Sequence, residues 1–207
     1  MPLFPGTDKF TGINWPLIRY SDILLMFAEA ENELNQGPTQ AAKDALYAVR
    51  ARAWAGNTDH IPAIPDGYEE FFQAIVQERA WELGGECLRK HDLIRWNMLA
   101  DKLAQTKEDL LKMRDRDTPY ENVPGELVWR NEGLTAEYLN LNYHMDSVAI
   151  ANRDSITWPN VVNWGGALSD EYITMHAQYF EPNWKELLPI HQTILDVNPN
   201  LTNEYGY

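Results

Sequence analysis

The chain has 207 residues, of which 44% are hydrophobic and 23% charged, so it can bury a substantial core as one domain or one large part of a domain. Its formal net charge of −14 at pH 7 argues against nucleic acid as a partner and disfavours docking on anionic lipid, because both need Lys and Arg. The single cysteine excludes an internal disulfide framework and a multi-cysteine metal site.

Two helices are predicted at the start of the chain. In the first, apolar residues share one face at spacings of three, four and seven: Leu17, Tyr20, Leu24, Phe27 and Leu34. Gly37-Pro38 ends this helix, and the second begins after Thr39, a suitable N-cap. The second helix has a face of mostly small residues: Ala42, Ala45, Leu46, Val49 and Ala53. Small side chains let helices approach closely, so the pair is predicted to form an antiparallel hairpin.

Two more helices are predicted at residues 68–83 and 87–114, with Gly84-Gly85 between them. The apolar stripe of the third helix consists of Phe72, Ile75, Val76 and Leu83. Two helix–turn–helix units of similar size in succession favour tetratricopeptide-like stacking, for which the usual repeat is about 34 residues.

The second half of the chain has a different character. Residues 117–183 show no sustained period and are rich in Trp, Tyr, Asn and Gly, which is typical of irregular loops. The predicted fold class is therefore all-α, with tetratricopeptide-like helical hairpins over residues 1–116 and long decorating loops over 117–183. Residues 184–207, rich in Pro and Asn, are predicted to form an extended C-terminal segment that packs on the helices.

Charged residues recur at helical spacing in the third and fourth predicted helices: Glu78, Arg79, Glu82, Arg89, Asp92 and Arg95. Two carboxylates such as Glu78 and Glu82 could act as acid and base. They lie on a strongly apolar helix, however, so we interpret the Arg–carboxylate pairs as buried contacts that fix two helices in register. Cys87 is likewise expected to be a small packed residue rather than a nucleophile.

Motifs for other chemistries are missing from the sequence. The five histidines include no pair at a spacing of three or four, and His144 with Asp146 is weak support for a metal. Neither a Gly-x-Ser-x-Gly elbow nor a glycine-rich phosphate loop occurs. We therefore predict no catalytic residue, metal or cofactor.

Aromatic residues are the one compositional surplus, with eight Trp, ten Tyr and six Phe. Sugar rings stack their apolar C–H faces on flat aromatic rings, while amide and charged side chains bond the hydroxyls. One stretch combines both kinds of residue and is the predicted ligand-binding site: Arg153, Asp154, Trp158, Asn160, Asn163 and Trp164. The alternative is that these aromatics form a small core of the irregular region. The tryptophans in helical or framework-like segments are expected in the core: Trp15, Trp81, Trp96 and Trp184.

Three segments stand in a fixed order that carries a family resemblance. They are Arg19–Glu31; Glu78–Arg79 with Glu82–Leu83 and Arg89–Trp96; and Leu187–Ile190 with Asn198–Leu201 and Gly206–Tyr207. Together they resemble the carboxy-terminal part of the SusD/RagB family. The likeness covers residues 16–100 and 184–207 well and residues 117–183 loosely.

The resemblance implies a tetratricopeptide-based helical scaffold with long loops. It also implies a non-catalytic protein, lipid-anchored on the outer membrane of Bacteroidetes-type bacteria, that binds oligosaccharide or polysaccharide at the cell surface. The partner implied is a SusC-like TonB-dependent transporter, which imports the glycan. Members of the family are typically more than twice this length. The chain is therefore expected to be a carboxy-terminal part, soluble without its anchor, whose first helix exposes an apolar face.

Two other functions remain open on the sequence. Helical hairpins of this kind commonly present a peptide groove, so this part could dock on another protein without touching sugar. A glycoside hydrolase would need two carboxyl groups about 5–10 Å apart across a cleft.

Overall fold

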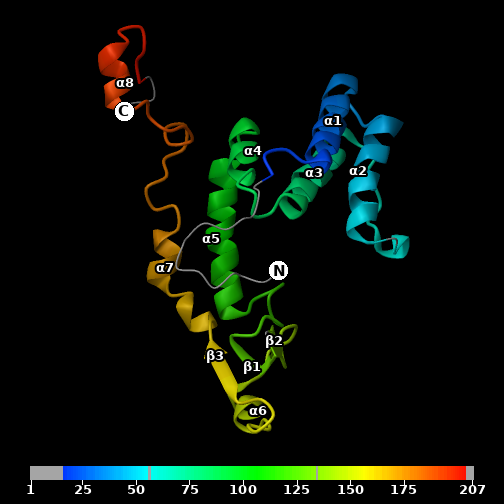
Figure 1. The fold of residues 1–207 in the computed structure, drawn as a ribbon, viewed down its shortest axis with the longest axis vertical. Helices are drawn as coiled ribbons and strands as arrows, with labels where there is room; N and C mark the ends of the chain where they lie inside the picture. The colour runs from blue at the N-terminus through cyan, green and yellow to red at the C-terminus, as the bar shows by residue number, and fades with distance from the viewer. Residues whose placement is uncertain (1–15, 56, 134, 204–207) are drawn as a thin grey trace. The chain divides into compact units, whose positions relative to one another are not determined.

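The computed structural model describes residues 16–55, 57–133 and 135–203 of a mostly helical chain (Figure 1). The chain divides into two compact units, residues 1–92 and 93–207. The division expected from the sequence, into residues 1–116, 117–183 and 184–207, remains a prediction. None of the helices in the described ranges combines the length and the apolar character needed to cross a bilayer.

Three long helices build the first unit: α1 (Tyr20–Asn35), α2 (Gln40–Ala53) and α3 (Tyr68–Glu82), with the short 3-10 turn η1 (Thr58–His60) before α3. The predicted N-cap of α2 is confirmed, since the Thr39 hydroxyl accepts a hydrogen bond from the Ala42 N–H at 3.2 Å. Helix α1 packs against both α2 and α3. The three helices share a hydrophobic core, which consists of Leu25, Ala28, Ala42, Ala45, Leu46, Val49, Phe71 and Ile75.

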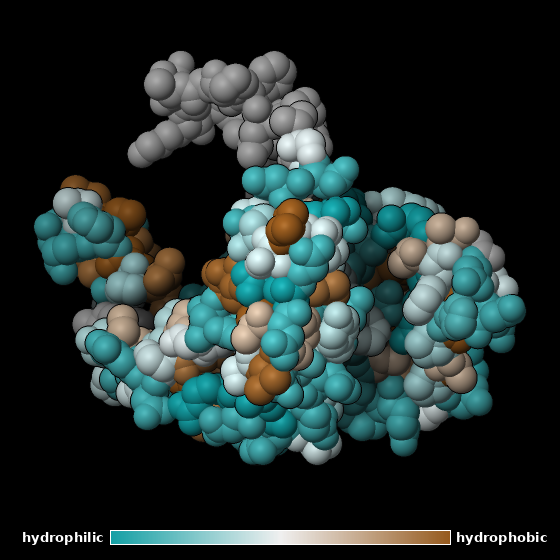
Figure 2. All heavy atoms as spheres, turned by 90° about the horizontal axis from the view of Figure 1, so that it is seen from below, coloured by the Kyte–Doolittle hydropathy of each residue, from teal (hydrophilic) through white to brown (hydrophobic). Residues whose placement is uncertain are grey.

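Helix α1 buries a different face from the one predicted. Its buried residues are Ser21, Asp22, Leu25, Ala28 and Asn32. The predicted stripe lies largely in solvent, with Tyr20 76% and Leu34 80% exposed. The reason is that the buried face carries the polar partners of α3. Asp22 accepts a hydrogen bond from Arg79, and Asn32 donates one to the carbonyl oxygen of Tyr68. An exposed apolar face on the first helix was itself expected and is confirmed. On the face of the molecule drawn in Figure 2, hydrophobic side chains, in brown, likewise lie among hydrophilic ones.

Helix α3 follows its predicted range, but Phe71 rather than Phe72 lies in its fully buried position. Two other burial predictions are wrong. Trp81, expected in the core, is 65% exposed, and Cys87 is exposed in the turn after α3 with φ +62°. Trp15 lies outside the described residues.

Buried ion pairs join the helices of the first unit, as the charged spacing predicted. Arg79 on α3 donates to Asp22 on α1 and to Asp92 on α4 (Arg89–Arg95), each at 2.7 Å, and all three groups are buried. Glu78 accepts from Arg50 on α2 at 2.9 Å. These carboxylates are therefore bound to guanidinium groups that hold the helices in register.

Glu82 links the start of α1 to the ends of α2 and α3. It accepts hydrogen bonds from Arg19 at 2.7 Å and from Arg52 at 2.6 Å. Burial by itself would raise the pKa of Glu82, but the hydrogen bond from Arg19 and the positive charges of Arg52 and Arg19 outweigh it. The net effect lowers the pKa below its ordinary value of 4.5.

The first unit should therefore lose stability in acid partly through Glu82. A carboxyl with a depressed folded pKa contributes stability above its unfolded value, here 4.5, and that stability disappears as the pH falls through the lower folded value. Thermal midpoints measured from neutral pH down to below the ordinary value will test this. The wild type should fall more steeply than Glu82→Gln over that window, and equal slopes would contradict the assignment.

The predicted fourth helix is two helices. Helix α4 ends at Arg95, and α5 (Leu99–Asp115) begins after Trp96–Met98, where Asn97 has φ +55°. A non-glycine residue in the left-handed region interrupts helical hydrogen bonding, so the long apolar pattern is cut at this point. Trp96 is half-buried and has the Arg95 guanidinium 4.3 Å from its ring centroid.

A small sheet in the second unit corrects the all-α prediction. Strands β1 (Glu126–Glu132), β2 (Thr135–Tyr138) and β3 (Asn160–Asn163) form an antiparallel sheet in the order β2-β1-β3. Val128 in the central strand is fully buried. The turn between β1 and β2 starts at Gly133, whose φ of +59° suits glycine. Each strand has at most seven residues, which is too short for alternation to stand out in the sequence.

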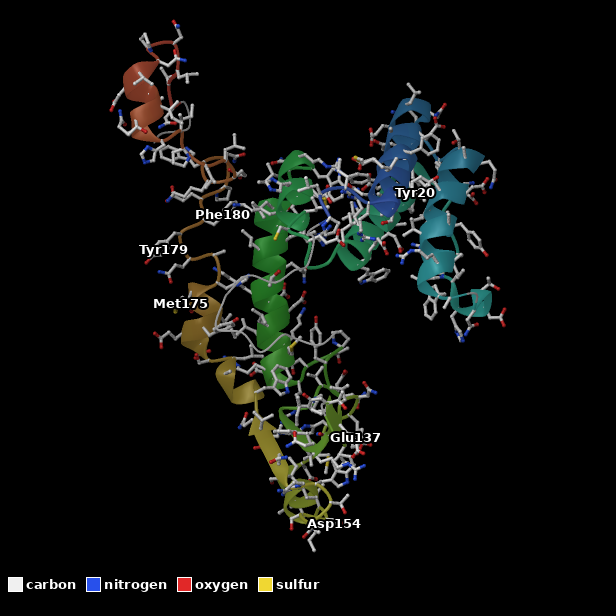
Figure 3. All side chains as sticks on the ribbon, viewed as in Figure 1. Tyr20, Glu137, Asp154, Met175, Tyr179 and Phe180 are labelled. Atoms are coloured by element: carbon white, nitrogen blue, oxygen red, sulfur yellow. The ribbon has the colours of Figure 1, made fainter. Side chains whose placement is uncertain are left out.

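Short helices complete the second unit: α6 (Ser147–Ala151), the 3-10 turn η2 (Gly165–Ala167), α7 (Asp170–Met175) and α8 (Gln192–Val197). Ile173 on α7 is buried and α7 packs against α5. Exposed apolar residues lie on α7 and just after it, where Met175 and Tyr179 are directed away from α5 (Figure 3). The C-terminal segment, expected to be extended, contains the helix α8, and Trp184, expected in the core, is 49% exposed.

Candidate functional site

An apolar pocket of about 320 Å³ lies next to the sheet in the second unit. Its lining combines proline and aliphatic side chains with one tryptophan and two amides: Pro119, Asn122, Val123, Pro124, Leu127, Leu141, Asn142 and Trp164. The pocket thus places the predicted ligand residue Trp164 beside two asparagines that the sequence did not single out. An aromatic wall with amides at its rim is the chemistry that suits a sugar ring.

Close backbone contact fixes the position of Trp164 after β3. The N–H of the next residue, Gly165, donates to the carbonyl oxygen of Gly125 at 2.9 Å. A Cβ atom at Gly165 would lie 3.1 Å from both the Cα and the carbonyl oxygen of Gly125, so only glycine fits comfortably there. The side chain of Asn163 accepts from the Gly166 N–H at 2.7 Å and closes the turn. Trp164 is therefore held against the start of β1, where Leu127 lies.

The opposite wall is positioned by the buried residue Asn140. Its side-chain oxygen accepts from the Val128 N–H, and its amide nitrogen donates to the Glu126 carbonyl oxygen, both at 2.9 Å. The amide thus mimics a strand backbone and binds the segment after β2 to β1. Leu141 and Asn142 follow directly, which explains why they line the pocket.

The two predicted tryptophans do not line the same pocket. Trp158 precedes β3 and Trp164 follows it, and the strand between them spans about 10 Å. Trp158 is half-buried, does not line the pocket of Trp164, and stacks with Arg130, whose guanidinium lies 4.8 Å from its ring centroid. Arg130 also binds Glu137 at 2.7 Å.

The predicted polar residues divide in the same way. Asn160 and Asn163 begin and end β3, and because side chains alternate along a strand they point to opposite faces. Arg153 donates to the carbonyl oxygens of Ile150 and Trp158, both at 2.9 Å, and so fastens the loop before β3.

Asp154 closes the turn next to α6 (Figure 3). Its carboxylate accepts from the Thr157 hydroxyl and from the N–H groups of Ile156 and Thr157. These hydrogen bonds, that of the Thr157 hydroxyl first, lower the pKa of Asp154. Of the six predicted residues, Trp164 is therefore the one at the apolar pocket, with Asn163 holding its turn.

Acid–base and metal chemistry have little basis at the apolar pocket. Its lining includes no carboxylate and no histidine, so it offers no pair of carboxyl groups for glycoside hydrolysis. Across the described parts of the chain, no group of three or more His, Cys, Asp and Glu side chains is arranged to hold a metal ion. The pocket can stack and hydrogen-bond a ligand.

Sequence reasoning missed the pocket residues that come from outside the Trp158–Trp164 stretch. A signal was present in the hairpin, where β-branched and aromatic residues flank Gly133. A second signal was the repeated asparagine in Asn140-Leu141-Asn142. Neither signal indicates that these residues meet Trp164, because their contact depends on the pairing of β1 with β3.

Comparison with known proteins gives a consistent result. SusD-like protein P25 of Formosa agariphila is 45% identical over 86 residues, which cover 41% of this chain and 16% of that protein. A crystal structure of a SusD homolog from Bacteroides thetaiotaomicron matches 93% of this chain with a TM-score of 0.59 and 24% identity, and shows a similar fold. The chain spans 27% of the length of that homolog. Residues 5–207 match the model of the SusD family, and the chain therefore belongs to this family.

Proposed function

We propose that the chain is the carboxy-terminal part of a protein that binds an oligosaccharide or polysaccharide at the cell surface without cleaving it. The glycan would then pass to a SusC-like TonB-dependent transporter in the outer membrane, to which the full-length protein is lipid-anchored. Membership of the SusD family supports the role in carbohydrate uptake. We also propose that the helical hairpins within residues 1–116 are tetratricopeptide-type repeats that serve as the scaffold.

The apolar pocket at Trp164 is the observation that carries the proposal for this part of the protein. The indole supplies a stacking surface, and Asn122 and Asn142 supply donors and acceptors for sugar hydroxyls. The pocket is built on a sheet whose loops are fixed by Asn140 and Gly165, so it is largely preformed. Its volume of about 320 Å³ is at the small end for ligand pockets and suits one sugar unit.

Affinity electrophoresis tests the proposal. The chain is run through native gels that contain neutral or acidic polysaccharides from plant, host and microbial sources, beside gels without polysaccharide. Retardation by at least one polysaccharide, with no reducing ends released on prolonged incubation, is the expected result. Release of reducing sugar would establish a hydrolase instead. No retardation by any polysaccharide would contradict sugar binding by this part of the protein.

A second candidate function, protein docking, is favoured by the outward side of α7. Tyr172 and Met175 on α7, and Tyr179 beyond its end, are 55%, 61% and 77% exposed. Exposed aromatic and methionine side chains are enriched at protein interfaces. A pull-down with the transporter that is lost in Met175→Ser/Tyr179→Ser, in a chain that no polysaccharide retards, would favour docking over sugar binding.

A further inference from the structure

A second pocket in the same unit has a different chemistry. It has a volume of about 460 Å³ and adjoins the first, since Gly165 and Glu126 line it while their neighbours Trp164 and Leu127 line the apolar pocket. Its remaining residues come from the end of α5, the loop before α6 and the end of β3, and they include Arg116 and His144. Most of these side chains are polar or charged, so this pocket suits hydrogen bonds and ion pairs rather than stacking.

Arg116 is unusual among the arginines of this acidic chain. Arginines that form at least one ion pair with a carboxylate are Arg19, Arg50, Arg52, Arg79, Arg114 and Arg130. The guanidinium of Arg116 has no hydrogen bond or ion pair with any residue in the described ranges. It lies over Gly125, because a Cβ atom at that glycine would be 3.4 Å from its Nη1. The chain thus directs an uncompensated positive charge to the wall of this pocket.

The backbone at Arg116 strengthens this observation. Arg116 ends α5 in the left-handed conformation, with φ 57° and ψ 37°, and its N–H bonds to the carbonyl oxygen of Lys112. Glycine or asparagine is preferred at this position, because a Cβ atom is strained there. Among the described residues, the Arg116 guanidinium has no hydrogen bond or ion pair that would offset this strain, which points to a ligand.

The other charged groups at the pocket limit what the ligand can be. Arg114 already binds Asp115 and Asp170, and Asp146 accepts from the Ala149 N–H as the N-cap of α6. Glu126 lines the pocket and would repel a second negative group, but it can accept hydrogen bonds from hydroxyls. The pocket therefore suits a molecule with one oxyanion and several hydroxyl groups.

His144 supplies a second polar group. Its Nδ1 is buried and has no hydrogen-bond partner within the described residues, although the residue lines the pocket. An unpaired buried nitrogen is unfavourable, and a small rotation of the ring toward the pocket would let it donate to a ligand oxygen.

We infer that this polar pocket binds the oxyanion, a carboxylate or sulfate ester, of an acidic sugar unit, with Arg116 as its principal partner. The inference rests on the proposed function, because it assigns the class of glycan that the site accepts. A guanidinium binds either oxyanion through two parallel hydrogen bonds. Glu126 accepts from the sugar hydroxyls, and the apolar pocket at Trp164 stacks a neighbouring unit.

Titration of the whole chain with small sugars tests the inference. The probes are sodium glucuronate, glucose 6-sulfate, the neutral methyl ester of glucuronate, and inorganic sulfate. Binding of each is measured from the NMR signals of the His144 ring. Glucuronate or glucose 6-sulfate should bind in the millimolar range and at least tenfold more tightly than the neutral ester. The tighter of the two identifies the oxyanion. Equal binding of the ester, or of inorganic sulfate, would overturn the assignment.

One variant separates the ligand from the fold. Arg116→Gly should lose at least tenfold in affinity for the acidic sugar while its thermal midpoint stays equal or rises, because glycine relieves the strain. Gln36→Gly is the matched control, since Gln36 ends α1 in the same conformation with φ 52°, and it should bind like the wild type. Wild-type affinity in Arg116→Gly would refute the inference.

Failure of this inference differs from failure of the proposed function. Retardation by a neutral polysaccharide that depends on Trp164, without glucuronate or sulfate-ester binding, would leave sugar binding intact and remove the acidic subsite alone. If no polysaccharide retards the chain and no acidic sugar binds, the proposed function and the acidic subsite are both wrong.

Discussion

Replacing Arg79 with leucine is expected to lower the free energy of unfolding of the first unit by about 3–5 kcal/mol. Arg79 is 5% exposed, and its guanidinium binds two buried carboxylates, Asp22 and Asp92. Leucine would remove the guanidinium that binds both buried carboxylates, and the desolvation of their charge is the source of the cost. Urea unfolding followed by far-UV circular dichroism measures the change as a lower midpoint.

Two further variants make this prediction specific. Arg52→Leu removes an arginine whose side chain is 61% exposed and should cost about 0–1 kcal/mol. The triple change Asp22→Asn/Arg79→Leu/Asp92→Asn should recover part of the loss, because the two carboxylates that Arg79 binds are then replaced by neutral amides. A loss in Arg79→Leu no larger than in Arg52→Leu would show that the buried network contributes little to stability.

Replacing Trp164 with alanine is expected to weaken binding of the retarding polysaccharide by about 2 kcal/mol, or roughly thirtyfold in Kd. The indole is the one aromatic ring in the lining of the apolar pocket, so alanine removes the stacking surface. The turn that follows is held by backbone bonds of Gly165 and Gly166, so the fold should be retained. Affinity electrophoresis over a series of polysaccharide concentrations gives the ratio of the two constants.

Two other tryptophans serve as controls for the site. Trp184→Ala removes an exposed indole outside this pocket and should leave binding unchanged. Trp158→Ala removes the ring that stacks with Arg130 and tests whether the stretch acts as one platform, as the sequence suggested. Equal losses in Trp158→Ala and Trp164→Ala would favour the single platform. A Trp164→Ala variant that binds like the wild type would place the sugar elsewhere.

The helices of the first unit could be predicted because local signals determine them. Gly37-Pro38, the Thr39 cap and Gly84-Gly85 mark ends that the structure confirms to within a few residues. The break at Asn97 and the three short strands could not be predicted in the same way. A single left-handed residue and strands of four to seven residues leave no periodic signal.

The candidate site was only partly predictable, for a related reason. The sequence indicated Trp164 through its composition of aromatic and amide residues, but it grouped this residue with Trp158 on the basis of proximity in the chain. Pairing of β1 with β3 places them at opposite ends of a strand and brings Leu127 to Trp164. Asn122, Asn140 and Asn142 acquire their roles only through that pairing.

The sequence by itself determined the family, the main helices of the first unit and the structural role of the charged residues on α3, because each depends on residue order or on spacing along one helix. Only the tertiary structure decided which face of α1 is buried, since that depends on what α2 and α3 offer to Asp22 and Asn32. It also decided that Arg116 stands without a partner among the described residues while Arg79 has two. The two arginines differ in burial and in binding partners, because both properties depend on which residues the folded chain places around a side chain.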